Sequence, residues 1–297
     1  TAIAAILITT GRSDWSSWLG DAWDYGVTEL RWMHYALLLA VCLLCHGELY
    51  RCRPRDSRHL TEFYLCMSLG GAFGGLFVTL VATPFFNDYY EWPIGLVLAV
   101  LLAWFVLGDG SFGKQTSRRV ITALGAALTI GGVLYFADPC ELRDHDSTDY
   151  QRKILDQARN FYGVVAVAES RYRDHPEQDH RSFYSGQTTH GHQFLARDRK
   201  REASTYYAPE SGVGETLRYL MKTYPSLDVA VVGLGAGTLA NYARVTDTYD
   251  FYEINPEAVR IANAWFDNLG QCKARQQRIL IGDARLKIEQ QPPSQIY

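Results

Sequence analysis

A glycine-rich turn between a strand-like run and a helix-like run constrains the fold of this chain more than any other feature. The continuous apolar run Asp228–Val232 is typical of a strand that is buried on both faces of a parallel sheet. The run ends at Gly233-Leu-Gly-Ala-Gly237, and Thr238-Leu-Ala-Asn-Tyr242 begins a helix. Glycines in such a turn permit a tight reversal and let the backbone approach a ligand. This order of strand, turn and helix predicts the first unit of a Rossmann-like domain.

Two acidic residues follow at the ends of the next two expected strands. Glu253 lies in the strand 250–254, 20 positions after Gly233, where a carboxylate can accept hydrogen bonds from both hydroxyls of a ribose. A third strand over 278–281 leads into Gly282-Asp283-Ala284. Open α/β sheets bind ligands at the carboxyl ends of their strands. The residues predicted to bind the cofactor are therefore Gly233, Gly235, Gly237, Glu253, Asp283 and Ala284.

The glycine spacing indicates which nucleotide this turn accepts. A dinucleotide site needs G-x-G-x-x-G, in which the helix start meets a pyrophosphate. Here Thr238 occupies the last position of that pattern, and Gly237 comes one place early. Together with Glu253 and Asp283, the spacing favours an adenosyl ligand without phosphates, such as S-adenosylmethionine. Asn255 is expected to cap the following helix, with Pro256 at its first position.

The chain before residue 138 is dominated by apolar runs. Each approaches the roughly 20 residues that cross a bilayer as a helix. The four runs are Trp32–Tyr50, Phe63–Phe86, Trp92–Leu107 and Val120–Ala137. Residues 1–10 resemble the tail of a fifth. We therefore expect an α-helical membrane domain over residues 1–137, with the lipid bilayer as its partner and a bacterial-type inner membrane as its location.

The side of the membrane that holds the soluble part stays open. The arginine-rich loop 51–59 and the loop with Lys114 should both face the cytoplasm. The run 120–137 would then deliver the following domain to the other side, where S-adenosyl compounds are scarce. The chain begins without Met inside an apolar run and ends at Tyr297 in an expected strand, so we expect a fragment at both ends.

Polar residues separate the apolar half from the glycine turn. Residues 138–160 are expected to form a linker that leads into a short helix. Strands over 161–169, 181–185 and 190–195 predict a small antiparallel β-domain within 161–200. The Rossmann-like domain then covers 201–297, truncated at its end. His190 and His192 alternate on one of these strands, but without a third ligand no metal site is predicted, and a net charge of −3 gives no reason to expect nucleic acid.

Several motifs of the chain resemble one enzyme family. They are Phe161-Tyr-Gly163, Ser185-Gly-Gln-Thr-Thr-His-Gly191, Tyr206-Tyr207, Ser211-Gly-Val-Gly214, Gly233-Leu-Gly-Ala-Gly237, Tyr252-Glu-Ile-Asn-Pro256 and Gly282-Asp-Ala284. In the apolar half, His46-Gly-Glu-Leu49 and Ser68-Leu-Gly-Gly-Ala-Phe-Gly-Gly75 belong to the same set. The chain thereby resembles the spermidine synthase (polyamine aminopropyltransferase) family, in its membrane-embedded, multi-helix branch.

The resemblance implies a reaction and assigns roles to residues. An aminopropyl group would pass from decarboxylated S-adenosylmethionine to a diamine such as putrescine. Glu253 would hold the ribose hydroxyls and Asp283 the adenine amino group. The β-domain would cover the site, and in that family it often supports a homodimer. The substrate side would include Gln187, His190, Tyr206, Tyr207 and Glu210.

Four features of this chain differ from the family pattern. Ala236 stands where soluble members carry an acid that faces the donor's amino group, and Thr189 stands where they carry glutamine. Their Tyr-His-Glu element reads Tyr206-Tyr-Ala-Pro-Glu210 here, and their catalytic aspartate would lie beyond Tyr297. Two alternatives therefore stay open: an S-adenosylmethionine-dependent methyltransferase, and a non-catalytic transporter or sensor with a nucleoside-binding domain. Tyr206 and Tyr207 fit a substrate pocket and a packed domain seam equally well.

Overall fold

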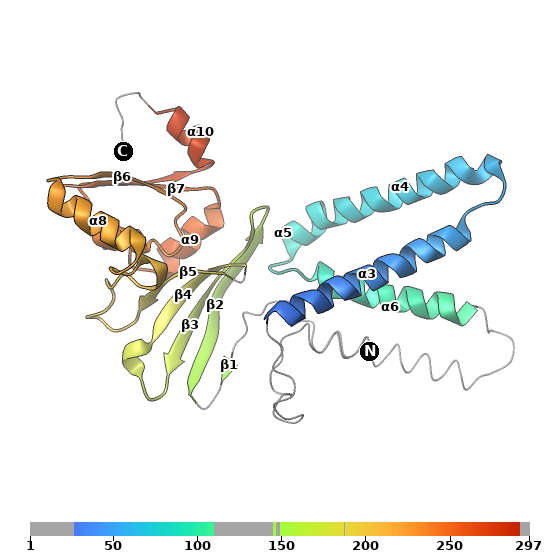
Figure 1. Ribbon diagram of the computed structural model, residues 1–297, viewed down its shortest axis with the longest axis horizontal. Coiled ribbons are helices and arrows are strands. Elements are labelled where there is room, and N and C mark those ends of the chain that lie inside the picture. The colour runs from blue at the N-terminus through green and yellow to red at the C-terminus, as the bar shows by residue number, and fades with distance from the viewer. Residues whose placement is uncertain (1–26, 110–144, 147–148, 187, 292–297) are drawn as a thin grey trace. The chain divides into compact units, whose positions relative to one another are not determined.

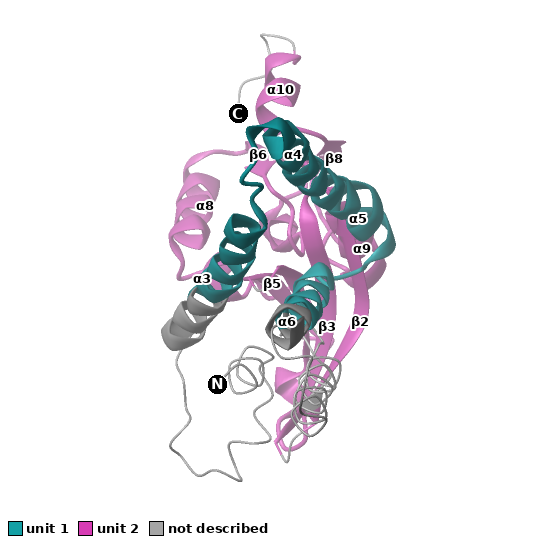
Figure 2. Cartoon of the chain, turned by 90° about the vertical axis from the view of Figure 1, so that its right-hand side faces the viewer, with its two compact units in different colours: residues 1–141 teal, residues 142–297 magenta. Residues whose placement is uncertain are grey.

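The structure, a computed structural model, describes residues 27–109, 145–146, 149–186 and 188–291 (Figure 1). The chain divides into two compact units, residues 1–141 and 142–297 (Figure 2). The division falls close to the predicted end of the apolar half. The two units are described separately below.

The first unit is helical wherever it is described. Helix α3 spans Val27–Cys52, α4 spans Leu60–Leu76, and α6 spans Glu91–Asp109. A single 3₁₀ turn, η3 (Ser57–His59), precedes α4. Three of the four predicted apolar runs fall on these helices. The run Val120–Ala137 and residues 1–10 lie outside the described residues.

Helix α4 continues through a wider turn before it ends. A π-helical segment, η4 (Phe77–Ala82), leads into the short α5 (Thr83–Phe85). Pro84 lacks the amide hydrogen that an α-helical bond would use at this place, and Thr83 Oγ1 donates to the carbonyl oxygen of Val78 at 2.9 Å. The missing amide therefore falls in the last turn of this helical stretch, eight positions after α4 ends at Leu76.

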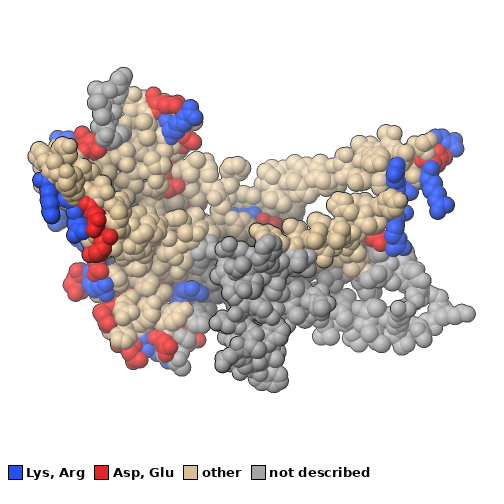
Figure 3. Space-filling model, in the orientation of Figure 1, with Lys and Arg blue, Asp and Glu red and all other residues tan. Residues whose placement is uncertain are grey.

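By length and composition, the continuous helical stretch Ser57–Phe85 is the one candidate membrane span within the described residues. Its large apolar side chains, such as Phe73 and Leu80, are exposed in the isolated chain. Charged side chains gather instead at the turn between α3 and α4 (Figure 3), where Arg51 pairs with Glu48 and Arg58 with Asp56. One apolar helix is weak support for membrane integration, and the full membrane domain remains a prediction.

The second unit begins with a five-stranded antiparallel sheet in the order β1-β2-β3-β4-β5. The strands are β1 (His145–Asp146), β2 (Tyr150–Asn160), β3 (Gly163–Tyr172), β4 (His180–Ser185) and β5 (Thr188–Phe194). Strands β3, β4 and β5 match the three expected ones. Residues Val164–Ser170 of β3 are all buried, so this strand forms the centre of the sheet.

The expected linker over residues 138–160 is wrong for its second part, because residues 150–160 form β2. The strand pairs with β3 along its whole length, but its register shifts between Ile154 and Asp156. Such a bulge interrupts the two-residue alternation by which a half-buried strand is recognised in a sequence. The charged residues Arg152 and Lys153, at the end of the strand that pairs with the two-residue β1, also made this segment resemble a polar linker.

A three-stranded parallel sheet follows, in the order β6-β7-β8. Its strands are β6 (Asp228–Val232), β7 (Thr248–Glu253) and β8 (Gln276–Ile281), close to the predicted ranges. Helix α9 (Pro256–Trp265) connects β7 to β8, and the Asn255 side chain caps it by accepting from the Glu257 amide at 3.0 Å. The predicted cap is confirmed. The wider Rossmann-like assignment remains a prediction.

The connection from β6 to β7 contains no α-helix. Residues Thr238–Tyr242 form a 3₁₀ helix, η7, so the expected helix start is corrected to a single short turn. The backbone is already extended at Ala243. The ion pair between Arg244 and Asp247 then fixes the residues that lead into β7. The glycine turn takes up residues 233–237 and the entry into β7 residues 243–247, so only the five residues of η7 remain for a helix.

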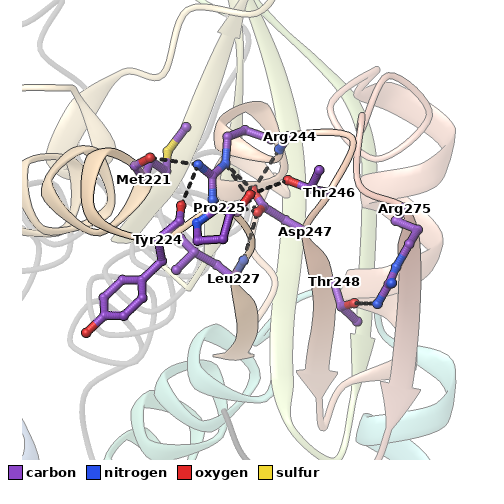
Figure 4. A network of polar contacts seen from close by, with 9 residues as sticks. All are labelled: Met221, Tyr224, Pro225, Leu227, Arg244, Thr246, Asp247, Thr248 and Arg275. Carbon is purple, nitrogen blue, oxygen red and sulfur yellow. Dashed lines mark hydrogen bonds and ion pairs between the residues drawn. The ribbon is translucent and has the colours of Figure 1, made fainter.

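A polar network secures this entry to β7 (Figure 4). Arg244 Nη2 lies 2.9 Å from Asp247 Oδ1, and Arg244 Nη1 donates to the carbonyl oxygens of Met221 and Tyr224. Asp247, whose side chain is fully buried, also accepts from the amide of Leu227 at 2.9 Å. The arginine holds the pKa of Asp247 below its ordinary value, against the opposing effect of burial.

Two apolar cores hold the second unit together. One lies between the antiparallel sheet and α9 and contains Val165, Val167, Phe183, Ala236, Ala258, Ile261 and Phe266. The other packs beneath the parallel sheet and contains Leu234, Ala240, Ala243, Tyr249, Phe251, Ala262 and Leu269. Because α9 contributes to both cores, the two sheets are parts of one packed body.

Two further helices flank the parallel sheet. Helix α8 (Gly212–Thr223) precedes β6 and is capped by Ser211, which accepts from the Gly214 amide. The spacing of Val213, Leu217 and Leu220 on one face predicts a helix over residues 212–222, which α8 matches. Helix α10 (Ala284–Glu289) follows β8. Both helices begin beside segments that contain predicted site residues.

Candidate ligand site at the carboxyl edge of the parallel sheet

The carboxyl ends of β6, β7 and β8 meet at one edge of the sheet. The Gly233 amide donates to the carbonyl oxygen of Tyr252 at 2.8 Å, and the Gly282 amide donates to that of Glu253 at 2.8 Å. These bonds extend the strand ladder by one residue on each side of β7. The three predicted ligand-binding segments are thus adjacent, as expected for parallel strands.

All three glycines of the turn adopt backbone angles that glycine favours. The φ angles of Gly233, Gly235 and Gly237 are 91°, 54° and 71°, which other residues rarely adopt. A side chain added at Gly233 would meet no atom within 4 Å. Space is therefore open beside the first glycine of the turn, while the other two are tightly surrounded.

Glu253 is buried and held by two backbone amides. Its Oε2 accepts from the Leu234 amide at 2.8 Å, and its Oε1 accepts from the Asn255 amide at 2.9 Å. Only 8% of the residue is exposed. A carboxylate oxygen has two lone pairs, so each oxygen retains one for a hydroxyl of a ligand. The open space and this fixed acceptor fit the ribose of an adenosyl group.

Asp283 lies at the end of β8, as predicted, but it already has a structural role. Its Oδ1 accepts from the Leu286 amide at 3.0 Å and caps α10. The residue is exposed, and Ala284 beside it is half-buried. The cap uses one carboxylate oxygen of Asp283, and the second oxygen could accept a hydrogen bond from a ligand.

The middle of β5 covers the glycine turn closely. The Ala236 amide donates to the carbonyl oxygen of His190 at 3.1 Å. A side chain at Gly235 would approach that oxygen to 2.5 Å, and one at Gly191 would approach Thr238 Oγ1 to 2.8 Å. The second glycine is therefore required by contact with the antiparallel sheet. Reasoning from the sequence assigned it to a ligand alone and missed this contact.

Ala236 faces the apolar core. Its side chain is fully buried in the cluster that contains Phe183 and Ile261. Its carbonyl oxygen accepts from Asn268 Nδ2 at 2.8 Å, and Asn268 Oδ1 in turn accepts from Gln193. An acid at this position would be buried among apolar side chains. The alanine that departs from the pattern of the resembled family therefore lies where the turn packs closely against the antiparallel sheet.

Three of the five predicted substrate-side residues lie together beside the turn. Tyr206 Oη lies 3.1 Å from His190 Nδ1, and Tyr207 donates to Tyr206 Oη at 3.3 Å. Burial and the neighbouring Tyr206 hydroxyl raise the pKa of Tyr207. The carbonyl oxygen of Tyr207 accepts from Tyr242 Oη at 2.6 Å. Glu210 is exposed, and Gln187 lies outside the described residues.

The tyrosine pair follows a residue with an unusual backbone angle. Thr205 has a φ of 59°, the one positive value among the described non-glycine residues. The pair itself lies in a 3₁₀ turn, η6 (Thr205–Tyr207). Such conformations persist only where the surroundings impose them. Here Tyr206 contacts His190, and the carbonyl oxygen of Tyr207 accepts from Tyr242.

An asparagine pair joins the antiparallel sheet to Glu253. Asn160 Nδ2 donates to Asn255 Oδ1 at 2.6 Å, and Asn160 Oδ1 accepts from the Tyr162 amide at 2.9 Å. Asn255 in turn donates its amide to Glu253. Sequence reasoning identified Asn255 as a helix cap but missed Asn160. An asparagine before a two-residue turn was the available signal.

The two histidines of β5 have separate partners. His192 packs against His180, with ring centroids 4.7 Å apart, whereas His190 contacts Tyr206. Burial, together with the neighbouring His180, lowers the pKa of His192 to about 4. Within the described part of the chain, no group of three or more histidine, cysteine or acidic residues is placed to hold a metal ion.

Comparison with models of known protein families and with curated proteins finds no match for the chain.

Proposed function

We propose that the carboxyl edge of β6, β7 and β8 binds an S-adenosyl ligand through its ribose. The observation that carries this proposal is the Glu253 carboxylate, fixed by the amides of Leu234 and Asn255 beside the open space at Gly233. A buried acceptor that is already oriented loses little freedom when a diol binds to it. The absence of a dinucleotide glycine pattern supports an adenosyl group without phosphates.

We infer that the chain is a membrane-anchored transferase of the aminopropyltransferase class, which uses decarboxylated S-adenosylmethionine and a diamine at this site. The amine nitrogen would attack the aminopropyl carbon beside the sulfonium, a C–N bond would form and the C–S bond would break. The electron pair of that bond returns to sulfur and gives methylthioadenosine, and the amine releases one proton. Alignment of the amine and the sulfonium is the largest contribution that a protein makes to such a displacement.

His190, Tyr206 and Tyr207 are the residues of this chain that would hold the amine. Their side chains form a connected polar group beside the glycine turn. The hydroxyl and imidazole acceptors fit an amine, which donates hydrogen bonds. The family's catalytic aspartate is not needed for binding, so recognition can be tested with the chain as given.

A methyltransferase is the second candidate, and Ala236 is the observation that favours it. The family uses an acid at this position to recognise the amino end of the decarboxylated donor, and here the position belongs to the apolar core. With intact S-adenosylmethionine, the acceptor would attack the methyl carbon and leave S-adenosylhomocysteine. The two reactions therefore differ in both donor and product.

Isothermal calorimetry on the full chain in mild detergent tests the ligand class. S-adenosylmethionine, its decarboxylated form and methylthioadenosine should bind, and Glu253→Gln should weaken each by about ten-fold or more, because a charged acceptor is lost. Asp228→Asn is the matched control, since Asp228 is exposed at the opposite end of β6. Failure of all three compounds to bind the unaltered chain would contradict the proposal.

Mass spectrometry then separates the reactions. Incubation with putrescine and the decarboxylated donor should yield spermidine and methylthioadenosine. Formation of S-adenosylhomocysteine from the intact donor would support the methyltransferase instead.

A further inference from the structure

The tip of the β2–β3 hairpin carries two exposed aromatic residues. Phe161 is 87% exposed and Tyr162 is 49% exposed, and their rings meet edge to face with centroids 5.6 Å apart. They are the two residues between Asn160 and Gly163, which pair across the hairpin. Two large aromatic side chains exposed side by side form an apolar patch of the kind that marks a binding surface.

Turn chemistry does not explain these aromatics. Two-residue hairpin loops favour asparagine and glycine, because the common turn types need positive φ angles. Phe161 and Tyr162 have no positive φ, and the positive angle falls on Gly163, at 113°. Asn160 Oδ1 accepts from the Tyr162 amide and stabilises the loop. The asparagine thus stabilises the turn, and the turn does not require aromatic side chains at Phe161 and Tyr162.

The same asparagine connects the tip to the ribose-binding carboxylate. Asn160 Nδ2 lies 2.6 Å from Asn255 Oδ1, and the Asn255 amide nitrogen lies 2.9 Å from Glu253 Oε1. Phe161 directly follows Asn160, so their Cα atoms are about 3.8 Å apart. Figure 1 shows this hairpin on the side of the parallel sheet where β7 passes into α9. The exposed rings therefore lie close to the candidate site.

Apolar side chains are also exposed along this edge. Val232 ends β6, Ile254 follows β7, and Ile281 ends β8; they are 72%, 42% and 48% exposed. A buried acid, a row of aliphatic side chains and an aromatic pair thus occupy one edge. A flat heterocycle attached to a diol has the complementary chemistry.

We propose that Phe161 and Tyr162 form an aromatic clamp that stacks on the adenine ring of the ligand whose ribose Glu253 holds. This inference rests on the proposed function, because it requires a nucleoside at the site. The purine supplies a π face that stacks on an aromatic ring, and the aliphatic residues contact its opposite side. Asn160 is a positioning residue that fixes the clamp relative to the carboxylate.

Calorimetry with methylthioadenosine on the full chain in mild detergent tests the clamp. Phe161→Ala should weaken binding by about ten-fold, the effect expected when one base-stacking ring is removed. Phe161→Trp should preserve binding. Tyr224→Ala is the matched control, because Tyr224 is 52% exposed but precedes β6 at the opposite edge of the sheet; it should leave affinity unchanged.

Fluorescence provides a second readout that a merely structural role would not change. In Phe161→Trp, methylthioadenosine should quench more tryptophan emission than it does in the unaltered chain, because the new indole stacks on the base. Equal affinity of Phe161→Ala and the unaltered chain, with no added quenching, would overturn the clamp and leave the ligand class intact. Failure of the unaltered chain to bind would overturn the proposed function and the clamp together.

Discussion

The carbonyl oxygen of His190 accepts from the amide of Ala236 at 3.1 Å and thereby occupies the space that a side chain at Gly235 would need. One strand of the antiparallel sheet is thus fitted directly onto the glycine turn of the parallel sheet. This contact makes the turn a structural junction as well as a ligand-binding loop. The packing role of these glycines can therefore be measured by stability, and their ligand-binding role by affinity.

Gly235→Ala should destabilise the fold more than Gly186→Ala. The two glycines have nearly the same φ, 54° and 57°, so the backbone strain of alanine is matched. A side chain at Gly186 meets no atom within 4 Å, whereas one at Gly235 meets the His190 oxygen at 2.5 Å. We expect Gly186→Ala to cost about 1 kcal/mol and Gly235→Ala at least about 1 kcal/mol more. Urea denaturation measures both, and equal values would contradict the junction.

Asp247→Ala should be among the most destabilising single changes in the second unit. The carboxylate is fully buried and accepts from Arg244 and from the Leu227 amide. Removing it leaves the Arg244 charge and a buried amide without their partner, which typically costs about 3–5 kcal/mol. Glu289→Ala, which breaks the exposed pair with Arg285, should change the unfolding free energy by no more than about 0.5 kcal/mol. Similar values for both variants would show that the network in Figure 4 is not a stabilising one.

Mild acid should weaken the fold through His192. Its pKa is about 4 in the folded chain, because of burial and the neighbouring His180, while Glu202 opposes and Arg199 adds to the shift. Its ordinary pKa is near 6.5, so between pH 6.5 and pH 4 the unfolded chain binds a proton that the folded chain does not. The contribution of His192 to stability is therefore complete above pH 6.5 and falls as the pH drops toward 4. His192→Gln should flatten that part of the stability profile, whereas replacement of the exposed His175 should leave it unchanged.

Local signals were enough to predict the strands of the parallel sheet and the position of Glu253 at the end of one of them. The strand 228–232, the cap at Asn255 and the carboxylate at Glu253 each follow from residues within a few positions of one another. Strand β2 was missed because its bulge and exposed charges obscure the alternation, although β3 pairs with it throughout. The 3₁₀ helix η7 lies where an α-helix was expected, because the glycine turn before it and the entry into β7 after it leave few residues for a helix.

Contacts between distant segments could not be predicted from local pattern. Gly235 carries no mark in the sequence that distinguishes contact with His190 from contact with a ligand. The sequence shows only that Ala236 stands where the resembled family has an acid. Its burial against Phe183 depends on how the two sheets pack. Asn160 and its partner Asn255 are likewise 95 positions apart in the chain. Such relationships arise from tertiary packing, which one sequence does not display.

Asn255 has two roles that substitutions can separate: it caps α9, and it accepts a hydrogen bond from Asn160. Asn255→Ser should retain the cap of α9, since serine accepts from the same amide, but its shorter side chain cannot maintain the bond to Asn160. Asn255→Ala should lose both and cost about 1 kcal/mol more in unfolding free energy. If the link positions the hairpin tip, Asn160→Ala should weaken methylthioadenosine binding in the unaltered chain and have little further effect in Asn255→Ser. Independent, additive effects of the two substitutions on affinity would show that the bond does not connect the tip to the site.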